Sequence, residues 1–330
     1  MKIIFVILTT MFLSQGVWAK PLPDYQPLLA QTKSKIWAID PKVDYTVQEV
    51  GKGTYVISDG IWQSAFVVTK DGVIVLDAPE TYAAKLPLEI SKHTSKPIKY
   101  LVYSHAHKDH IGGSAVFKDI KDLKIVALES THHFLLEKQD PNRLIPNMVF
   151  SGKKTIELGG VEVQLTNHRN YHSDEGDLLI YVPHSKFLLA VDTITPDYVP
   201  FMGFDLSSNF HEYMRMFDDI LSYDFKIFSG GHLSHMGTRK DVELAKEFTL
   251  DVYETTKRVH ANTNMYEIMG ETAKIVGWDN KFALFDVFLN KVMDDATSEL
   301  TAKWGDRLSN ADIWMRSHVR TALIYIRWDD

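Results

Sequence analysis

The stretch Ser104-His105-Ala106-His107-Lys108-Asp109-His110-Ile111-Gly112-Gly113 decides the fold of this 330-residue chain. It follows an apolar run, residues 98–103, that is typical of a buried strand. Three histidines and one aspartate crowd into this turn, and imidazole nitrogens and carboxylate oxygens are ligands that zinc favours. Without a metal, these side chains would compete for the same water and repel one another when protonated. The alternative, a surface loop that is rich in histidine by chance, leaves the histidines and aspartate after later strands unexplained.

The N-terminus has the pattern of a secretory signal peptide over residues 1–19. A basic start, Met1-Lys2, precedes a mostly apolar run over residues 3–13, and the segment ends in the small residue Ala19. The apolar run is shorter than the roughly 20 residues that a spanning helix needs. An uncleaved membrane anchor is the alternative. The signal predicts a periplasmic or secreted protein with no stable membrane span after cleavage.

Composition narrows the chemistry and the partners. The chain has no cysteine, so it forms no disulfide, and a metal site must use His, Asp or Glu. A net charge of −7 with no long basic cluster gives no electrostatic reason to expect nucleic acid or an anionic membrane as a partner. The partner that we expect is a small-molecule substrate.

The patterning predicts two successive sets of strands, each followed by helices. The expected strands cover residues 45–50, 54–58, 61–69, 73–77, 98–103, 124–128, 154–158, 161–166, 178–182, 187–191 and 226–228. The expected helices cover residues 82–93, 114–118, 130–138, 208–221 (with Ser207 or Ser208 as its cap) and 239–259. Two such halves fit an α/β fold, an αββα sandwich in which two mixed β-sheets face each other and helices cover both outer faces.

Two further segments flank this region. Residues 20–44 are expected to form an N-terminal arm, extended or with a short helix. Residues 261–330 are expected to form a C-terminal helical extension of two or three helices, because aromatic and aliphatic residues recur there at helical spacing. These apolar faces suit a core or the interface of a homodimer.

Three later segments place a histidine or an aspartate directly after a predicted strand: residues 167–172, 187–193 and 229–232. Loops at strand ends gather at an edge of a sandwich, where a rigid scaffold supports residues that carry chemistry.

Each of these segments leaves an alternative open. His168 competes with His172, and His235 competes with His232. Asp192 is otherwise a buried turn aspartate that binds backbone amides. Asp77, which ends a predicted strand, is either a carboxylate that supports metal ligands or a turn aspartate. The other histidines are expected to be ordinary surface or core residues: His93, His132, His133, His184, His211, His260 and His318.

The order of these motifs resembles the metallo-β-lactamase-fold hydrolases. The family pattern is His-x-His-x-Asp-His after a strand, then a lone His, a strand-terminal Asp and Gly-His. Residues 172–183 and 231–242 are also similar to exported members, with one extra residue between the histidine and the strand. The resemblance covers roughly residues 45–260 and implies a metallo-β-lactamase-like domain there, followed by the extension over 261–330.

The resemblance also implies a site for two zinc ions per chain, with iron or manganese less favoured. One zinc would be held by His105, His107 and His172, the other by Asp109, His110 and His232, with Asp192 bridging them. Asp109 would also be the catalytic proton relay. The chain lacks the cysteine that some lactamases place near Asp192, and Val191-Asp192-Thr193 is more similar to the thioester- and lactone-hydrolysing branches, although cysteine-free lactamases exist.

The leading hypothesis is a zinc-dependent hydrolase that uses a metal-activated hydroxide on an ester, lactone, thioester or amide bond, β-lactams included. Residues 59–64 and 196–204 are expected to form pocket walls, unless the second segment packs onto the C-terminal helices instead. One alternative is an iron-dependent oxidoreductase similar to the sulfur dioxygenases of this fold, which hold one iron with two His and an Asp. The complete set of ligands for two metals argues against it. The other is a non-catalytic metal-binding protein, which nothing in the sequence favours.

Overall fold

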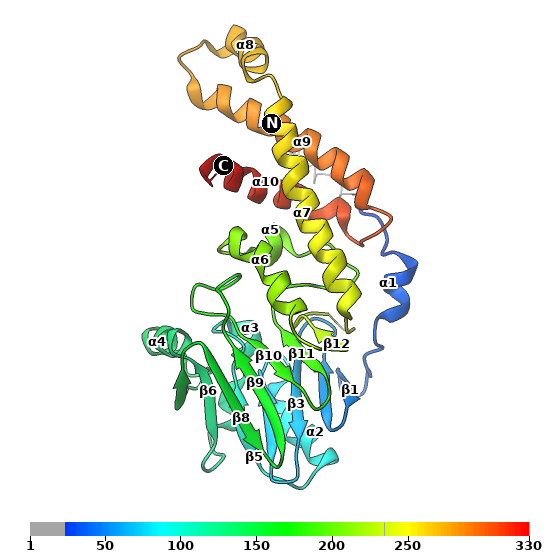
Figure 1. Ribbon diagram of the computed structural model, residues 1–330, viewed down its shortest axis with the longest axis vertical. Coiled ribbons are helices and arrows are strands. Elements are labelled where there is room, and N and C mark those ends of the chain that lie inside the picture. The colour runs from blue at the N-terminus through cyan, green and yellow to red at the C-terminus, as the bar shows by residue number, and fades with distance from the viewer. Residues whose placement is uncertain (1–23, 234, 330) are drawn as a thin grey trace, which may run out of the picture.

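Two facing β-sheets with helices on both outer faces form the body of the protein (Figure 1). The computed structural model describes residues 24–233 and 235–329, and the predicted signal peptide lies outside them. The αββα sandwich predicted from the sequence is confirmed.

The first sheet has seven strands in chain order: β1 (Thr46–Gly51), β2 (Thr54–Ser58), β3 (Gln63–Val68), β4 (Val73–Leu76), β5 (Ile98–Val102), β6 (Lys124–Leu128) and β7 (Met148–Phe150). Neighbours from β1 to β4 pair antiparallel, and those from β4 to β7 pair parallel. Strand β7 was not predicted, because three residues are too few to show a period-two pattern.

The second sheet has the order β12-β11-β10-β9-β8. Its strands are β8 (Lys153–Leu158), β9 (Val161–Thr166), β10 (Leu179–Val182), β11 (Phe187–Ala190) and β12 (Ile227–Ser229). Strands β9 and β11 both run antiparallel to β10, and β12 runs parallel to β11. The carboxyl ends of β9, β11 and β12 therefore lie at one edge, where the predicted ligand loops begin.

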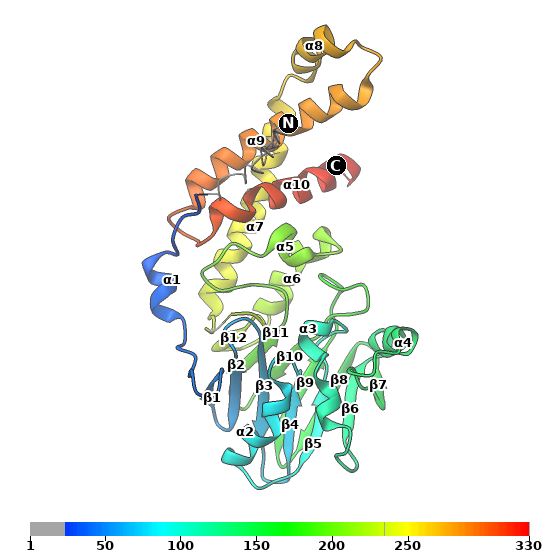
Figure 2. The ribbon, with the colours of Figure 1, turned by 180° about the vertical axis from the view of Figure 1, so that it is seen from behind.

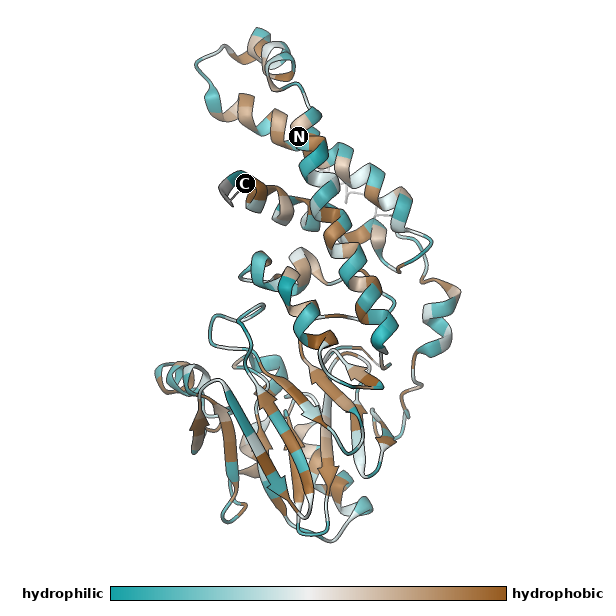
Figure 3. Ribbon diagram, in the orientation of Figure 1, coloured by the Kyte–Doolittle hydropathy of each residue, from teal (hydrophilic) through white to brown (hydrophobic). Residues whose placement is uncertain are grey.

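Apolar faces of the two sheets meet in a common core. Val56, Ile74 and Val102 from the first sheet are fully buried in one cluster with Ile180 and Leu189 from the second. Figure 3 shows these strands as predominantly apolar. Burial of this many aliphatic side chains supplies the main driving force for pairing the sheets.

Short helices cover the outer face of the seven-stranded sheet. They are η1 (Ala83–Lys85), α2 (Leu86–His93), α3 (Lys108–Ile111), η2 (Ser114–Phe117) and α4 (Glu129–Lys138). Leu86, Ile90 and Phe117 pack against Phe66 and Leu101 of the sheet.

The five-stranded sheet is covered by α6 (Phe210–Leu221) and α7 (Arg239–Asn262). The short segment α5 (Met202–Leu206) has left-handed φ/ψ at residues 203–205 and packs against the C-terminal helix. The predicted cap of α6 at Ser207 or Ser208 is wrong. Asn209 is the cap, and its Oδ1 accepts a hydrogen bond from the Glu212 amide at 3.1 Å. The Ser207 hydroxyl donates instead to the Tyr171 carbonyl, so it is engaged on the loop after β9.

The C-terminal extension comprises α8 (Met265–Val276), α9 (Lys281–Trp304) and α10 (Ala311–Asp329), at the upper end of the molecule in Figures 1 and 2. Helix α10 packs against α5, α7 and α9. None of the helices in the described part of the chain is both long enough and apolar enough to cross a membrane.

The N-terminal arm runs from the extension to the sandwich and contains α1 (Ala30–Lys35) (Figure 2). The Thr32 hydroxyl lies 2.9 Å from the Ser309 hydroxyl, and Lys35 forms an ion pair with Asp197 at 2.7 Å. Asp197 belongs to the loop after β11, so the arm contacts both the extension and the site edge of the sandwich.

Candidate metal site

Four strand ends supply the candidate ligands. His105 and His107 follow β5, and Asp109 and His110 lie on the single turn of α3. His172 lies in the loop after β9, Asp192 follows β11, and His232 follows β12. The edge predicted from the strand pattern is therefore where all seven residues lie.

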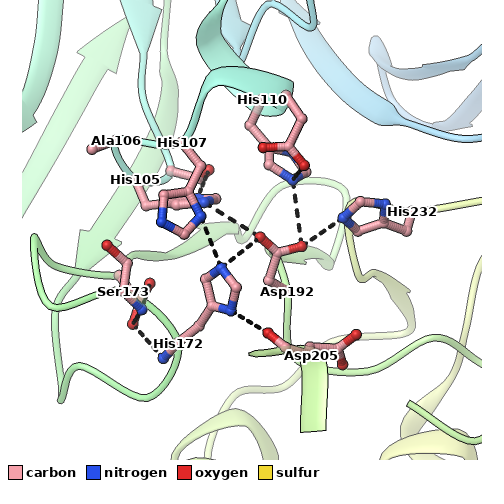
Figure 4. A network of polar contacts seen from close by, with 12 residues as sticks. His105, Ala106, His107, His110, His172, Ser173, Asp192, Asp205 and His232 are labelled. Atoms are coloured by element: carbon pink, nitrogen blue, oxygen red, sulfur yellow. Dashed lines mark hydrogen bonds and ion pairs between the residues drawn. The ribbon is translucent and has the colours of Figure 1, made fainter. Parts of the chain in front are cut away.

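Asp192 lies at the centre of the site (Figure 4). Its Oδ2 is 3.1 Å from His172 Nε2 and 3.3 Å from His105 Nε2. Its Oδ1 is 2.6 Å from His232 Nε2 and 3.4 Å from His110 Nε2. The two oxygens of one carboxylate thus face two different sets of histidines.

The donor atoms form two groups, and within each group they lie within 4.8 Å of one another. The first group is His105, His107, His172 and Asp192, and the second is Asp109, His110 and His232. The resemblance implied the same two sets of three ligands. Asp192 is grouped here with the first set, and its Oδ1 also lies 2.6 Å from His232 Nε2 of the second.

Neighbouring groups orient the histidine rings. His172 Nδ1 donates to the Asp205 carbonyl at 2.6 Å, and this contact turns the ring so that its Nε2 is directed at Asp192. His105 Nδ1 lies 3.0 Å from the Ser104 hydroxyl, and the Ser104 amide donates to Asp77 Oδ1 at 2.8 Å. Asp77 therefore supports the loop after β5 and is outside both groups of donors.

The loop that carries His172 is held by Asp177. The carboxylate of Asp177 accepts hydrogen bonds from the amides of Tyr171 and His172, each at 2.9 Å. Arg169 anchors the same loop to α6 through Glu212 and Asp219.

The electrostatics of the site centre on one buried negative charge. Burial lowers the pKa of His105 to about 3. Burial also acts to lower the pKa of His172 and of His232, but the charge of Asp192 outweighs it and raises each to about 9. Burial disfavours ionisation of Asp192, yet the positive charges of His110 and His172 hold its pKa well below its usual range.

The donor set fits divalent metal ions. His105 Nε2 and His110 Nε2 are buried and have no hydrogen-bond partner among the described residues. Unpaired buried polar atoms are costly, and here they belong to a set of His and Asp donors that suits zinc. Metal ligation would satisfy these nitrogens.

The structure separates the competing histidines. His168 lies outside both groups, and its Nε2 is 3.1 Å from the Tyr223 hydroxyl. His235 also lies outside them, and its Nε2 donates to the Pro196 carbonyl at 2.7 Å. The carboxylate of Asp192 faces histidines, which disfavours the alternative of a turn aspartate that binds backbone amides.

A cavity of about 490 Å³ opens over the donors. Both predicted wall segments contribute to it, with Ile61 and Trp62 from one and Tyr198, Val199 and Phe201 from the other. The second segment also packs on the extension, since the rings of Phe201 and Trp314 lie 5.0 Å apart. Residues 196–204 therefore both form a wall of the cavity and pack onto the C-terminal helices.

Sequence reasoning missed three residues near the site. Asp205 and Trp314 line the cavity, and Asp205 also binds His172. His318, expected to be ordinary, is fully buried and accepts a hydrogen bond from the Phe204 amide at 3.0 Å. No local motif marks them, because each acts on a residue far away in the sequence.

The family model for the metallo-beta-lactamase superfamily matches residues 62–232, which contain every donor described above. The chain belongs to the metallo-beta-lactamase superfamily. This superfamily member is 26% identical over 153 residues to the 2,4-dinitroanisole O-demethylase subunit alpha of a Nocardioides strain, across 45% of this chain and 46% of the relative. It is 24% identical over 148 residues to the metallo-beta-lactamase type 2 of Elizabethkingia meningoseptica, across 44% of this chain and 56% of the relative.

The metallo-beta-lactamase from Pontibacter korlensis has a similar fold, with a TM-score of 0.55 and 16% identity over 62% of this chain and 97% of that one. The chain spans about half the length, or less, of the curated relatives it matches.

Proposed function

We propose that this superfamily member is a dinuclear zinc hydrolase that cleaves an ester, lactone, thioester or amide bond, and that it is exported to the periplasm or beyond. The observation that carries the proposal is the placement of Asp192, whose Oδ1 and Oδ2 face two separate groups of donors. A carboxylate in this position is suited to bridge two metal ions.

His105, His107 and His172 would hold one zinc, Asp109, His110 and His232 the other, and Asp192 both. Zinc bound there supplies a hydroxide near neutral pH and polarises the carbonyl oxygen of the substrate. In the overall reaction the oxygen of water bonds to the carbonyl carbon, and the bond to the leaving oxygen, sulfur or nitrogen breaks. One proton of that water passes to the leaving group.

Asp109 is the candidate relay for that proton. Its carboxylate borders the cavity, and Trp62 Nε1 lies 3.4 Å from its Oδ2. The indole N–H of Trp62 donates to this oxygen and so orients the carboxylate.

Relatives do not fix the scissile bond. One relative is named as an O-demethylase of 2,4-dinitroanisole and another as a metallo-beta-lactamase, so the two names point to different kinds of substrate. The proposal for this chain therefore rests on the donor geometry.

Elemental analysis of the purified mature protein tests the metal content. We expect close to two zinc per chain, with less in His107→Ala and in His232→Ala. His168→Ala is the matched control, because His168 lies outside both donor groups. A single iron would overturn the proposal in favour of the oxidoreductase reading, and absence of metal would favour a non-catalytic one. A panel of chromogenic ester, lactone, thioester and lactam substrates then tests hydrolysis.

A further inference from the structure

We propose that the cavity over the metal site selects uncharged substrates with an apolar alkyl or aryl acyl group, and that α10 of the C-terminal extension forms part of the binding wall. The preference among substrates of the reaction rests on the proposed hydrolase function. The binding of apolar ligands in the cavity does not depend on that function. It concerns the walls of the cavity rather than its metal-ligand floor.

The walls of the cavity are predominantly apolar. Outside the metal donors, eight of the lining residues are aliphatic or aromatic: Ile61, Trp62, Tyr198, Val199, Phe201, Leu206, Leu233 and Trp314. Pockets of this volume and lining bury the apolar part of a small ligand and use a few polar groups to orient it.

Outside the metal donors, the described walls of the cavity also lack a basic side chain. Among the described residues, none that borders the cavity is a lysine or an arginine. The nearby Lys108 pairs with Glu80 at 3.2 Å, and Lys35 pairs with Asp197, so both side chains have other partners. A substrate with a carboxylate on its acyl chain would leave that charge without a partner in an apolar wall, which is costly.

Asp205 adds to this selection. It lines the cavity, and its Oδ2 is buried without a hydrogen-bond partner in the described part of the chain. A carboxylate in the wall is the wrong partner for an anionic acyl group, because it accepts hydrogen bonds and donates none when ionised.

Exposed apolar side chains at the cavity indicate surface that a ligand would cover. Ile61, Phe201 and Leu206 are each about half exposed although they line the cavity. Apolar side chains that are exposed together in this way often mark a ligand-binding groove.

Helix α10 contributes through Trp314. The indole lines the cavity and lies edge-on to the ring of Phe201, with centroids 5.0 Å apart. Asn310, which directly precedes α10, lines the same cavity. The extension thus reaches the substrate space of the sandwich, and removal of Trp314 should open the wall without changing the metal donors.

Binding is tested first, on the mature protein as purified and without reference to catalysis. The probe is N-phenyl-1-naphthylamine, an uncharged apolar fluorophore, displaced by octanamide. We expect the fluorescence to saturate as the probe is added, and we expect the dissociation constant of the probe to be at least tenfold larger for Trp314→Ala than for the wild-type protein. Trp278→Ala is the matched control, because Trp278 is an exposed tryptophan of the same extension and does not line the cavity. Equal binding by the two variants would overturn the role of α10.

Kinetics test selection by charge. We expect kcat/KM for p-nitrophenyl esters to rise from acetate to hexanoate by roughly fourfold per added methylene over the part of the chain that is buried. The p-nitrophenyl monoester of adipic acid matches the hexanoate in chain length but ends in a carboxylate, and it should react at least tenfold more slowly. Ile61→Arg should narrow that difference, because it places a cation at the half-exposed rim.

The outcomes separate the two proposals. Hydrolysis that is equally fast for the hexanoate and the adipate monoester would overturn the selectivity while leaving the hydrolase intact. Probe binding that depends on Trp314, with no hydrolysis of any substrate, would overturn the hydrolase and support the apolar site.

Discussion

The main-chain carbonyl of Asp205 accepts a hydrogen bond from Nδ1 of His172 at 2.6 Å. Asp205 lies in a run of four residues, 203–206, that all have positive φ. Such a left-handed turn costs about 1–2 kcal/mol for each residue other than glycine, so the surroundings must hold it. Helix α10 does so, because the amides of Gly203 and Phe204 donate to Ser317 Oγ and His318 Nδ1, each at 3.0 Å. The extension thereby orients a candidate metal ligand.

Replacing His318 tests this chain of contacts. His318→Leu leaves the Phe204 amide and the Pro200 carbonyl without partners, at a cost of about 1–3 kcal/mol each. We expect a loss of about 2–6 kcal/mol in the free energy of unfolding by urea and a weaker affinity for one zinc in a chelator competition. His318→Gln, which retains a donor and an acceptor, should recover much of both. Unchanged zinc affinity in His318→Leu would limit the residue to a structural role.

His318 also predicts an acid sensitivity. Burial lowers its pKa to about 3, so the folded protein holds it neutral while the unfolded chain binds a proton near pH 6.5. The unfolded state therefore binds more protons between these values, and stability falls as the pH drops through this window. From pH 7 to pH 5 the contribution of His318 is a loss of about 2 kcal/mol. Urea unfolding of the wild-type protein and of His318→Gln at both pH values checks this, because the variant lacks that part of the loss.

Asp192 should set the protonation of His172 and His232 in the metal-free protein as well as the affinity for both zinc ions. In Asp192→Asn, the negative charge that raises the pKa of His172 and His232 to about 9 is absent. We expect both pKa values in the metal-free variant to fall by more than one unit, as followed by NMR titration of the imidazole protons. We also expect both zinc ions to bind more weakly, since the two donor groups share this carboxylate. Loss of one zinc with full retention of the other would contradict a bridging position.

The contrast between the donors and their supports explains what the sequence could predict. His105, His107, Asp109 and His110 lie on one short segment, and Asp192 lies just after an apolar strand, so local patterns locate them. His172 and His232 lie further along the loops after β9 and β12, and the family resemblance is what favours them over His168 and His235. The contact between Phe204 and His318 joins residues 114 positions apart, and no periodicity encodes such a pair. The left-handed turn has a glycine only at Gly203, so its other three residues carry no conformational signal.

Strand and helix boundaries could likewise be predicted where local residues mark them, and not where a tertiary contact decides them. Strands β2, β6 and β9 match the predicted ranges because turn residues flank them. The cap of α6 was misplaced because Ser207, Ser208 and Asn209 are all good caps, and only the tertiary engagement of Ser207 distinguishes them.

Gly231 is a backbone requirement of the site. Its φ is +85°, and a Cβ there would lie 2.7 Å from Val191 Cγ1 and 3.3 Å from His110 Cε1. Gly231→Ala should therefore destabilise the fold by about 2 kcal/mol or more and reduce zinc content, as measured by urea unfolding and elemental analysis. Gly270→Ala is the control, since it meets no atom within 4 Å on helix α8 and should be neutral or stabilising by up to about 1 kcal/mol. Equal effects of the two changes would exclude the crowding argument.

The tip of the extension predicts self-association. Ile275 and Phe282, on α8 and α9, are 87% and 91% exposed, and Tyr266 on α8 and Trp278 between the two helices are also exposed. Large apolar side chains gathered on adjoining helices of a protein with a net charge of −7 are costly in water, and a symmetric interface between two copies would cover them. We expect light scattering after size exclusion to give the mass of a dimer, and Ile275→Ser with Phe282→Ser to give a monomer that retains its zinc. A wild-type monomer at tens of micromolar would refute the homodimer.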